Sequence, residues 1–567
     1  MKNRRRARET ALQILYEVDV RKISVEKVLE TTFSRYRFKP EIKKFARKLV
    51  LGSYQFLSPI NSLIKKYAKN WTLERMATVD RNILRLSTYE LLLLDDIPPV
   101  VSINEAVEIA KRYGTADSGK FVNGILDKIS KERGPNSSLR WTYLKESLKK
   151  DLYLKKLIEV KGEEKIWLVG GCLRNLLLGK EKKDLDLIVE DPDFKAAQIF
   201  AQHIKRSLII LRPTLRIITL PEGITIDFTL KKSAQIQTNL IKRDFTINAL
   251  SLDVERLELP SFFLIDPSTG LEDLINKKIK LIRKESIDED PLRMLRAFRL
   301  SAQLNFSIEE NIPSLIQQKS ILIKNVSTER VREEIFLLLE SPLSYKYIDN
   351  LSAKTLLKQI LGQNLNIENL KRLEELLSSN KIIPGEIKKR VLLHLKENSQ
   401  GKKSRKNLLK LIALLFSPEE KTSLSSGGKQ LKLTRKQIKI MKKVEKVYPH
   451  LKKIMKDQQR NPLLVAQFLI EAGKETVETL LLFLTVNFER PPSQKFALSL
   501  LQEYFQRFSL LPHPSGLIKG EELMELLGIS AGPQVAYILN KIHQAQVAGK
   551  INTKEKAIKF AKKLIST

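Results

Sequence analysis

The chain has 567 residues, too many for one hydrophobic core, and this length predicts three or four domains. Its 101 Lys and Arg residues against 65 Asp and Glu residues give a formal net charge of +36, which favours a polyanionic partner such as nucleic acid. The single cysteine excludes an internal disulfide, and no apolar run reaches the roughly 18 residues that cross a bilayer. We therefore expect a soluble, cytoplasmic protein that binds RNA or DNA and no membrane.

Residues 1–132 carry a helical pattern and no strong strand pattern. Apolar side chains recur at three- and four-residue spacing, as in Ala11, Ile14, Leu15 and Val18. A basic cluster leads directly into this helix. A solvated basic tail is the plainer explanation, but guanidinium groups held beside a folded surface suit phosphates and single-stranded RNA. We predict RNA contacts from Arg4, Arg5, Arg6 and Arg8.

A second marker of this region is the segment 97–129, in which Ser102 can cap a helix and Glu105 can complete a capping box. With the arginine-rich start, it resembles the NusB antitermination factor family across residues 2–131. The resemblance implies an all-α bundle that binds RNA, typically with the small ribosomal subunit protein NusE. The same fold also precedes RNA methyltransferase domains, but no methyl-donor glycine motif follows here.

Breakers and polar residues at 132–138 predict a linker, which we extend over 133–160. From about residue 165 the helical pattern gives way to short segments rich in β-forming residues, and residues 161–283 are expected to form a mixed α/β domain. The expected strands are "IWLVGG", "LDLIV", "SLIILRP", "LRIITLP" and "ITIDFTL", with "GGCLRNLLLG" turning into a helix. From residue 284 to the end the periodicity is helical again.

Paired carboxylates stand at the start of the strand in "KDLDLIVE". Asp184 and Asp186 share one face of that strand, and such close like charges disfavour each other unless a cation lies between them. Mg²⁺ takes a few carboxylate oxygens together with substrate phosphates, and Asp227 on a later strand can supply a third acid. A solvated strand end is the alternative. The preceding glycine turn and arginine favour a triphosphate site over that alternative, because the combination is more specific than two aspartates alone. The predicted residues of this site are Gly170, Gly171 and Arg174.

Two later segments add nucleotide contacts. In "KRDFTINAL", Arg243 can pair with phosphate, and Asp244, with Asn248 close by, can accept from a ribose hydroxyl, although an ordinary helix start is the better explanation of this segment taken alone. In "EDPLRMLRAFR", an acid and two arginines are three residues apart, so they lie on one face of a helix. A carboxylate and a guanidinium side by side match the edges of cytosine and adenine and leave uracil and guanine unpaired. A surface ion-pair stripe is the alternative for Asp290, Arg293 and Arg296.

These motifs, together with "DPSTGLEDL" and "STERVREEI", occur in the order found in class II tRNA nucleotidyltransferases, a family that is similar to bacterial poly(A) polymerases. The resemblance covers about residues 160–567 and includes the last fifty residues. It implies a polymerase-β-like head at 161–283, a helical neck at 284–345 and a helical body and tail at 346–567. It also implies Mg²⁺ as cofactor, CTP and ATP as substrates and tRNA as partner. By the same resemblance, Asp184 and Asp186 are metal ligands.

Two departures from the family pattern are Asn175, where an acid usually follows the motif arginine, and Lys242, where an arginine is usual. The interval 228–242, between Asp227 and Arg243, is also short. Family members that complete CCA usually carry a longer flexible loop here, which can act as a lever when the base pocket changes from cytosine to adenine. We therefore expect an enzyme that adds C residues and stops after two, with full CCA addition as the alternative.

A basic helix lies further along the chain. Between residues 429 and 456, Lys and Arg recur at helical spacing, which indicates either a solvated face or a phosphate-tracking surface for tRNA. The predicted contacts are Lys432, Arg435, Lys436, Lys439 and Lys443. Three functions remain open at this point. They are a tRNA 3′-end nucleotidyltransferase that releases pyrophosphate, a poly(A) polymerase, and an antitermination-type RNA-binding protein whose transferase part is inactive.

Overall fold

The computed structural model describes residues 2–68, 71–94, 97–131, 141–181, 184–221, 223–255, 264–400, 403–418, 423–456, 461–508, 517–547, 550–551 and 553–565. The chain forms two compact units, which are described separately. The first is Met1–Ser286 with Phe306–Glu309, and the second is Ile287–Asn305 with Glu310–Thr567. Within the described residues, no helix combines the length and the apolar character needed to cross a bilayer. The expected linker residues 132–138 lie outside the described residues.

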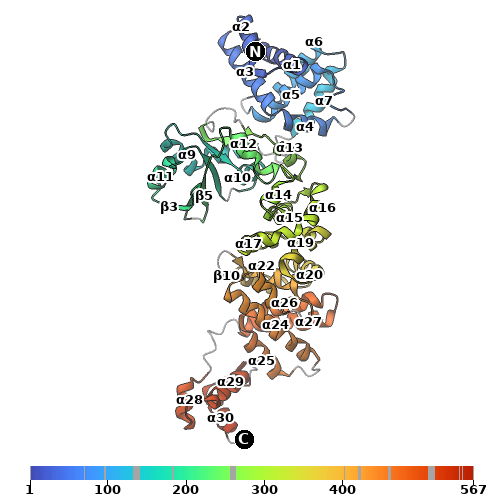
Figure 1. Ribbon diagram of the computed structural model, residues 1–567. Helices are drawn as coiled ribbons and strands as arrows, with labels where there is room; N and C mark the ends of the chain where they lie inside the picture. Colours follow the sequence, from blue (N-terminus) through green and yellow to red (C-terminus); the bar gives the residue numbers. More distant parts are fainter. Residues whose placement is uncertain are drawn as a thin grey trace. The chain divides into compact units, whose positions relative to one another are not determined.

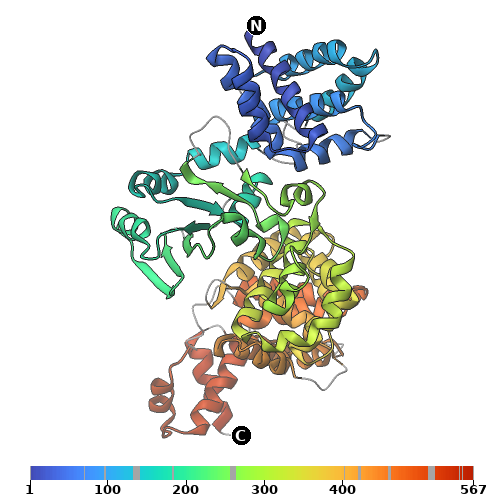
Figure 2. The ribbon, with the colours of Figure 1, turned by 45° about the horizontal axis from the view of Figure 1, so that its top comes forward.

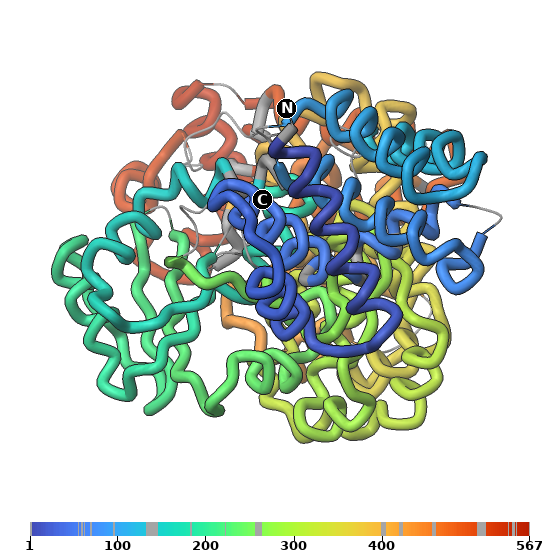
Figure 3. The backbone as a smooth tube through the Cα atoms, turned by 90° about the horizontal axis from the view of Figure 1, so that it is seen from above, coloured from blue at the N-terminus to red at the C-terminus, as the bar shows by residue number. Residues whose placement is uncertain are grey.

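Helices alone make up the described residues of the N-terminal domain, as expected (Figure 1). α1 packs against α3 and α5, and the tube view shows α1 running beside the other helices of this domain (Figure 3). Its buried stripe includes Ala11, Ile14 and Leu15, the residues that set the helical period. The helices are α1 (Lys2–Arg21), α2 (Val25–Arg35), α3 (Pro40–Gln55), α4 (Leu57–Tyr67), α5 (Thr78–Leu93), α6 (Pro99–Tyr113) and α7 (Ser118–Ser130).

The expected capping box on α6 is wrong. The helix begins at Pro99, so Ser102 lies within its first turn, where its hydroxyl donates to Glu90 Oε1 at 2.6 Å. Glu105 does not reach back to the helix start, because its carboxylate accepts from the Arg5 guanidinium at 2.7 Å. Proline at the first helical position has a backbone conformation already suited to a helix, and it starts α6 four residues earlier than a serine cap at position 102 would.

The segment predicted as a linker, 133–160, contains two helices, α8 (Trp141–Lys149) and α9 (Leu152–Val160). Leu144 and Leu148, four residues apart, are fully buried, as are Leu154 and Leu157. Helix α8 packs against α10, and α9 against α11. These apolar pairs cover the sheet domain, so the prediction of an unstructured connection over 141–160 is corrected.

The mixed α/β domain is built on a seven-stranded sheet with the order β3-β4-β5-β2-β1-β6-β7 (Figures 1 and 2). All five expected strands form, as β1 (Ile166–Val169), β2 (Leu185–Val189), β3 (Leu208–Arg212), β4 (Leu215–Thr219) and β5 (Thr225–Leu230). β2 and β5 run parallel, whereas the other neighbouring pairs of the sheet are antiparallel. The short β6 (Ser251–Asp253) and β7 (Leu264–Ile265) were not foreseen, because two or three residues carry no periodicity.

Short helices connect the strands of this domain. They are α10 (Gly171–Leu177), α11 (Lys195–His203), α12 (Ile236–Ile241), the 3₁₀ turn η2 (Thr246–Asn248) and α13 (Gly270–Ile275). A separate parallel pair joins β8 (Lys278–Ile279) to β9 (Ser307–Ile308). Trp167 and Val169 of β1 pack with Ile236 and Leu240 of α12 in one apolar cluster. The segment after β5 is therefore anchored to the centre of the sheet.

The second unit is almost entirely helical. Its exception among the described residues is a small hairpin that the sequence did not indicate, β10 (Asn398–Gln400) with β11 (Lys403–Ser404). A short helix, α14 (Ser286–Glu289), spans the boundary in sequence between the two units. The helices between it and the hairpin are α15 (Leu292–Leu304), α16 (Asn311–Lys319), α17 (Thr328–Glu340), α18 (Tyr345–Ile348), α19 (Leu351–Leu361), α20 (Ile367–Ser378) and α21 (Gly385–Lys396), with the 3₁₀ segment η4 (Ser320–Asn325) after α16. The helices that follow it are α22 (Arg405–Leu415), α23 (Leu424–Gln430), α24 (Arg435–Lys456), α25 (Pro462–Ala472), α26 (Thr476–Val486) and α27 (Pro491–Glu503).

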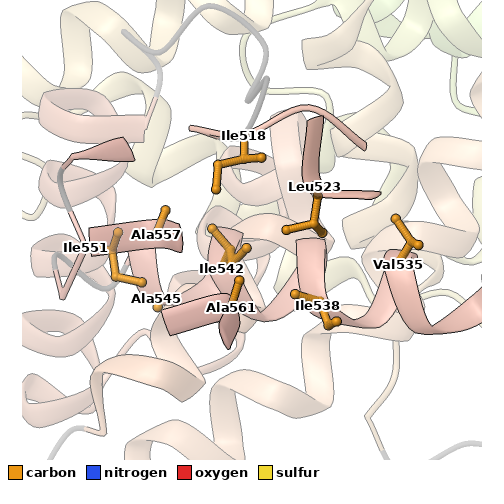
Figure 4. Close-up of a cluster of buried hydrophobic side chains, with 9 residues drawn as sticks. All are labelled: Ile518, Leu523, Val535, Ile538, Ile542, Ala545, Ile551, Ala557 and Ala561. Carbon is orange, nitrogen blue, oxygen red and sulfur yellow. The ribbon is translucent and has the colours of Figure 1, made fainter. Parts of the chain in front are cut away.

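The last helices form a small cluster of their own, α28 (Gly520–Leu527), α29 (Pro533–Val547) and α30 (Lys554–Ile565). Leu523, Ile538, Ile542 and Ala561 converge on one buried core, together with neighbours from all three helices (Figure 4). Gly528 ends α28 in the left-handed conformation at φ 64°, which lets the chain turn directly into α29.

Candidate active site

The carboxylates of the α/β domain meet across two parallel strands. Asp186 on β2 and Asp227 on β5 are register partners, so their side chains emerge side by side from one face of the sheet. Asp184, two residues before Asp186, shares that face and lies at the exposed end of the strand. The structure thus brings together the three acids that were predicted from strands far apart in sequence.

The close spacing of these acids affects the pKa of two of them, Asp227 and Asp186. Burial, together with the negative charges of Asp186 and Asp184, raises the pKa of Asp227 to about 6. Burial also raises the pKa of Asp186, and Arg243 acts in the opposite direction. Asp227 Oδ1 is buried and has no hydrogen-bond partner among the described residues. A group of crowded carboxylates with an unsatisfied oxygen is the environment that a bound cation would relieve.

No three His, Cys, Asp or Glu side chains in the described parts of the chain are spaced to enclose a metal ion by themselves. This is compatible with Mg²⁺, which keeps several water and substrate ligands and needs only one or two protein carboxylates. Asp184 and Asp186 fit that role. Their spacing leaves the remaining coordination positions to a triphosphate.

The glycine turn lies directly against these acids. Gly170 has φ 79°, a left-handed conformation, and a Cβ built there would lie 2.7 Å from both Asp186 Oδ2 and Arg243 Nη1. Only glycine fits this position without displacing the carboxylate or the guanidinium. The turn therefore brings β1, β2 and the segment after α12 to one point, where a negative and a positive group face the same small space.

Arg174 is held underneath the turn by amide oxygens. Its Nη1 donates to Asn248 Oδ1 at 2.5 Å, and its Nε and Nη2 donate to Asn175 Oδ1 at 3.1 and 2.9 Å. Asn248 in turn donates to Asp244 Oδ1 at 3.0 Å. Asn175, the departure from the family pattern, thus acts as a neutral acceptor. It orients the guanidinium without cancelling its charge as an aspartate would.

This chain of hydrogen bonds changes the interpretation of Asp244 and Asn248. Both side chains are buried, and Asp244 Oδ1 also accepts from the backbone N–H of Phe245 at 2.8 Å. Their contacts brace Arg174 and the segment that follows Arg243. A direct contact between Asp244 and a ribose remains a prediction.

The expected base-reading face lies in the second unit. Asp290 Oδ2 accepts from Arg330 Nη2 of α17 at 2.7 Å, and Arg293 of α15 is 3.7 Å from Glu289. Arg296 donates through Nε to Glu334 at 3.0 Å, and Glu334 also pairs with Arg299. Arg330 and Glu334, four residues apart on α17, were not singled out from the sequence. The sequence pattern that could have indicated them is "STERVREEI", in which an arginine and a glutamate four residues apart share one helix face.

The predicted RNA-binding residues at the N-terminus separate into two groups. Arg8 is buried and donates two hydrogen bonds of 2.8 Å to Glu90, so its guanidinium belongs to the domain core. Its predicted role as an RNA contact is therefore withdrawn. Arg5 is paired with Glu105. Arg4 and Arg6 are exposed, and Arg4 also lies over the ring of Phe45 at 5.4 Å.

The basic face of α24 is largely in solvent. Arg435, Lys436 and Lys439 are exposed. Lys443 is paired with Glu475 at 3.0 Å, and Lys432 with Glu329 at 3.1 Å. The phosphate-binding prediction therefore rests on the three exposed residues near the start of the helix.

Comparisons with known proteins match successive parts of the chain. Residues 5–131 match the NusB family, 166–280 the poly A polymerase head domain, 305–365 the probable RNA and SrmB-binding site of polymerase A, and 402–561 the putative domain 2 of tRNA nucleotidyltransferase. The CC-adding tRNA nucleotidyltransferase of Synechocystis sp. is 27% identical over 403 residues, which cover 70% of this chain and 93% of that protein. The transcription antitermination protein NusB of Desulforamulus reducens is 46% identical over 126 residues, 22% of this chain and 88% of the relative.

Solved structures share the fold. The Thermotoga maritima CCA-adding enzyme complexed with tRNA has a TM-score of 0.54 at 23% identity, covering 73% of this chain and 94% of that one. A CCA-adding enzyme in complex with CTP has a TM-score of 0.58 at 22% identity, covering 75% and 98%. The chain is therefore a fusion, in which a domain of the NusB family precedes segments that match the poly A polymerase head domain and a tRNA nucleotidyltransferase domain.

Proposed function

We propose that this protein is a template-independent tRNA nucleotidyltransferase that adds C residues to the tRNA 3′ end. The observation that carries this proposal is the register of Asp186 against Asp227, beside a glycine turn that Arg243 also approaches. The Synechocystis relative and the match to a tRNA nucleotidyltransferase domain support tRNA as the substrate.

In the proposed reaction, the 3′ hydroxyl oxygen of tRNA forms a bond to the α-phosphorus of CTP while the bond to the bridging oxygen breaks, and pyrophosphate leaves. Mg²⁺ held by Asp184 and Asp186 would lower the charge of the triphosphate and of the attacking oxygen. Asp227 lies beside Asp186 and has a buried, unsatisfied oxygen, which places it to accept the hydroxyl proton. Arg174 and Arg243 would orient the phosphates, and no group here needs to change its oxidation state.

Base choice is assigned to Asp290 and Arg293. The carboxylate accepts from the exocyclic amino group of cytosine, and the guanidinium donates to its ring acceptor. Uracil presents the opposite pattern and would leave both side chains without a partner on the base. Arg330 holds Asp290 through Oδ2, which supports a carboxylate in one fixed orientation.

Termination after two C residues is supported by the segment that follows β5. After Leu230, α12 begins at Ile236, and Lys232 N donates to Asn239 Oδ1 at 3.0 Å across the turn. Leu240 is fully buried against β1. A short segment with two such anchors cannot act as the lever that a change from cytosine to adenine requires. The Synechocystis relative is itself CC-adding.

We assign tRNA binding to the exposed start of α24, and RNA binding to the N-terminal domain through Arg4 and Arg6. A NusE-type ribosomal protein is a further candidate partner of that domain, supported by its membership of the NusB family. An inactive transferase part is disfavoured, because Asp184, Asp186 and Asp227 are all present and together.

The test uses purified protein, Mg²⁺ and a tRNA that ends at the discriminator base, with labelled CTP and ATP supplied together. A dominant product two nucleotides longer supports CC addition. A product three nucleotides longer and ending in A would restore full CCA addition. Poly(A) polymerase, the alternative favoured by the name of the matching head domain, would instead give a long ladder with ATP alone. No extension at all would overturn the transferase assignment.

A further inference from the structure

Thr225, the first residue of β5, makes two contacts to the first aspartate of the pair. Its backbone N–H donates to Asp184 Oδ1 at 2.9 Å, and its hydroxyl Oγ1 donates to the same oxygen at 3.0 Å. Asp184 precedes β2, and 41 residues of chain separate it from Thr225. These two bonds are therefore a tertiary contact that forms only when β2 and β5 pair.

The register explains why this threonine reaches that oxygen. Leu185 is opposite Ile226, and Asp186 is opposite Asp227, so Asp184 and Thr225 are the residues that precede these pairs. Because side chains alternate along a strand, Thr225 shares its face with Asp227, and Asp184 shares the same face with Asp186. The four side chains form a two-by-two block, in which the threonine is the uncharged member.

Asp184 has a particular need for such support. It lies at the exposed end of its strand, whereas Asp186 is enclosed by the glycine turn and by the sheet. An exposed aspartate populates several rotamers, and ordering it costs free energy each time a ligand binds. Two donors on Oδ1 restrict that rotation, and they leave Oδ2 as the oxygen that Thr225 does not engage.

We propose that Thr225 is a positioning residue, which fixes the Asp184 carboxylate so that its Oδ2 is presented to a divalent cation. This inference rests on the proposed function, in which Asp184 is a metal ligand. The side chain of Thr225 also hydrogen-bonds to Asp227, so it acts through the carboxylates that it contacts, as residues that hydrogen-bond to metal ligands do in other proteins.

The decisive substitution is Thr225→Val, which keeps the shape and the β-branch of the side chain and removes only the hydroxyl. The backbone N–H bond persists in this variant, so we expect the lower end of the usual effect of such residues, about tenfold weaker cation binding. Thr225→Ser restores the hydroxyl and is expected to restore affinity to within about twofold of the parent. The matched control is Thr219→Val, because Thr219 is the exposed cross-strand neighbour of Thr225 on β4.

Binding is measured by electron paramagnetic resonance titration of Mn²⁺ into the full-length protein with CTP present and tRNA absent, so that no transfer takes place. Thermal unfolding of each variant confirms that the fold is retained. Weaker Mn²⁺ binding in Thr225→Val, with rescue by serine and no change in Thr219→Val, supports the inference. Equal Mn²⁺ affinity in the parent and Thr225→Val would overturn it, as would a serine variant as weak as valine. A parent protein that neither binds Mn²⁺ nor extends tRNA would instead count against the proposed function.

Discussion

Arg330 on α17 donates a 2.7 Å hydrogen bond to Asp290, so the carboxylate that we assign to base recognition is held by a residue forty positions later in the chain. Arg330→Ala should therefore loosen Asp290 without removing it. An ion pair exposed to this degree contributes about 0.2–1 kcal/mol, and we expect KM for CTP to rise up to about fivefold with a smaller change in kcat.

The control for this variant is Arg332→Ala. Arg332 lies on the same helix, but it contacts the backbone oxygen of Lys432 and not Asp290. Steady-state kinetics with CTP distinguish the two substitutions. Equal effects of both would indicate that α17 contributes only to stability.

Arg293→Ala should relax the choice of base more than it weakens triphosphate binding. A lost contact to a base edge typically costs about 1–3 kcal/mol of discrimination, which corresponds to about five- to 150-fold. The measurement is the ratio of kcat/KM for CTP to that for UTP. If UTP stays rejected as strongly as by the parent, Arg293 does not read the base.

Asp186→Ala should abolish nucleotide transfer while tRNA affinity stays within about twofold, because affinity comes from phosphate contacts spread over the basic surfaces. Filter binding and primer extension on the same preparation measure the two properties. Turnover within tenfold of the parent would exclude Asp186 as a ligand of the catalytic metal.

The N-terminal domain offers a paired test of its arginines. Expressed alone, residues 1–132 should fold as a helical domain and bind RNA with a steep salt dependence. Arg6→Ala should weaken RNA binding and leave stability unchanged. Arg8→Ala leaves Glu90 buried without its partner and should cost about 3–5 kcal/mol of unfolding free energy. Equal unfolding free energies of the two variants in urea would refute the assignment of Arg8 to the core and Arg6 to the RNA-binding surface.

Asp19 predicts how the stability of this domain depends on pH. Burial alone would raise its pKa, but Arg85, Lys22 and Arg81 outweigh burial and lower the pKa to about 2. Because the folded pKa is below the unfolded one, the contribution is complete above pH 4 and is lost as the pH falls toward 2. We expect Asp19 to contribute about 2 kcal/mol of unfolding free energy at neutral pH, because its pKa falls from 3.8 to about 2 on folding.

The measurement for Asp19 is the difference in unfolding free energy between the parent domain and Asp19→Asn from pH 2 to pH 6. That difference should shrink as the pH falls, since both proteins then carry a neutral side chain at position 19. A difference that stays constant over this range would show that the ion pairs with Arg81 and Arg85 do not contribute.

The sequence determined the local elements and the chemical types of the site residues. The five main strands and the N-terminal helices follow from short-range periodicity, which depends only on which neighbouring side chains are apolar. The glycine turn and the D-x-D pair could be recognised because each is a contiguous motif. Their assembly into one site was an expectation from strand pairing.

Only the tertiary structure decided which charged residues have partners. Arg4, Arg5, Arg6 and Arg8 look alike in the sequence, yet the helical rotation of α1 against α5 buries Arg8 on Glu90 and leaves Arg6 in solvent. Thr225 carried no signal either, because its importance comes from an aspartate 41 residues away. A hydrogen bond between distant residues depends on the register of two strands, and no pattern within either strand encodes that register.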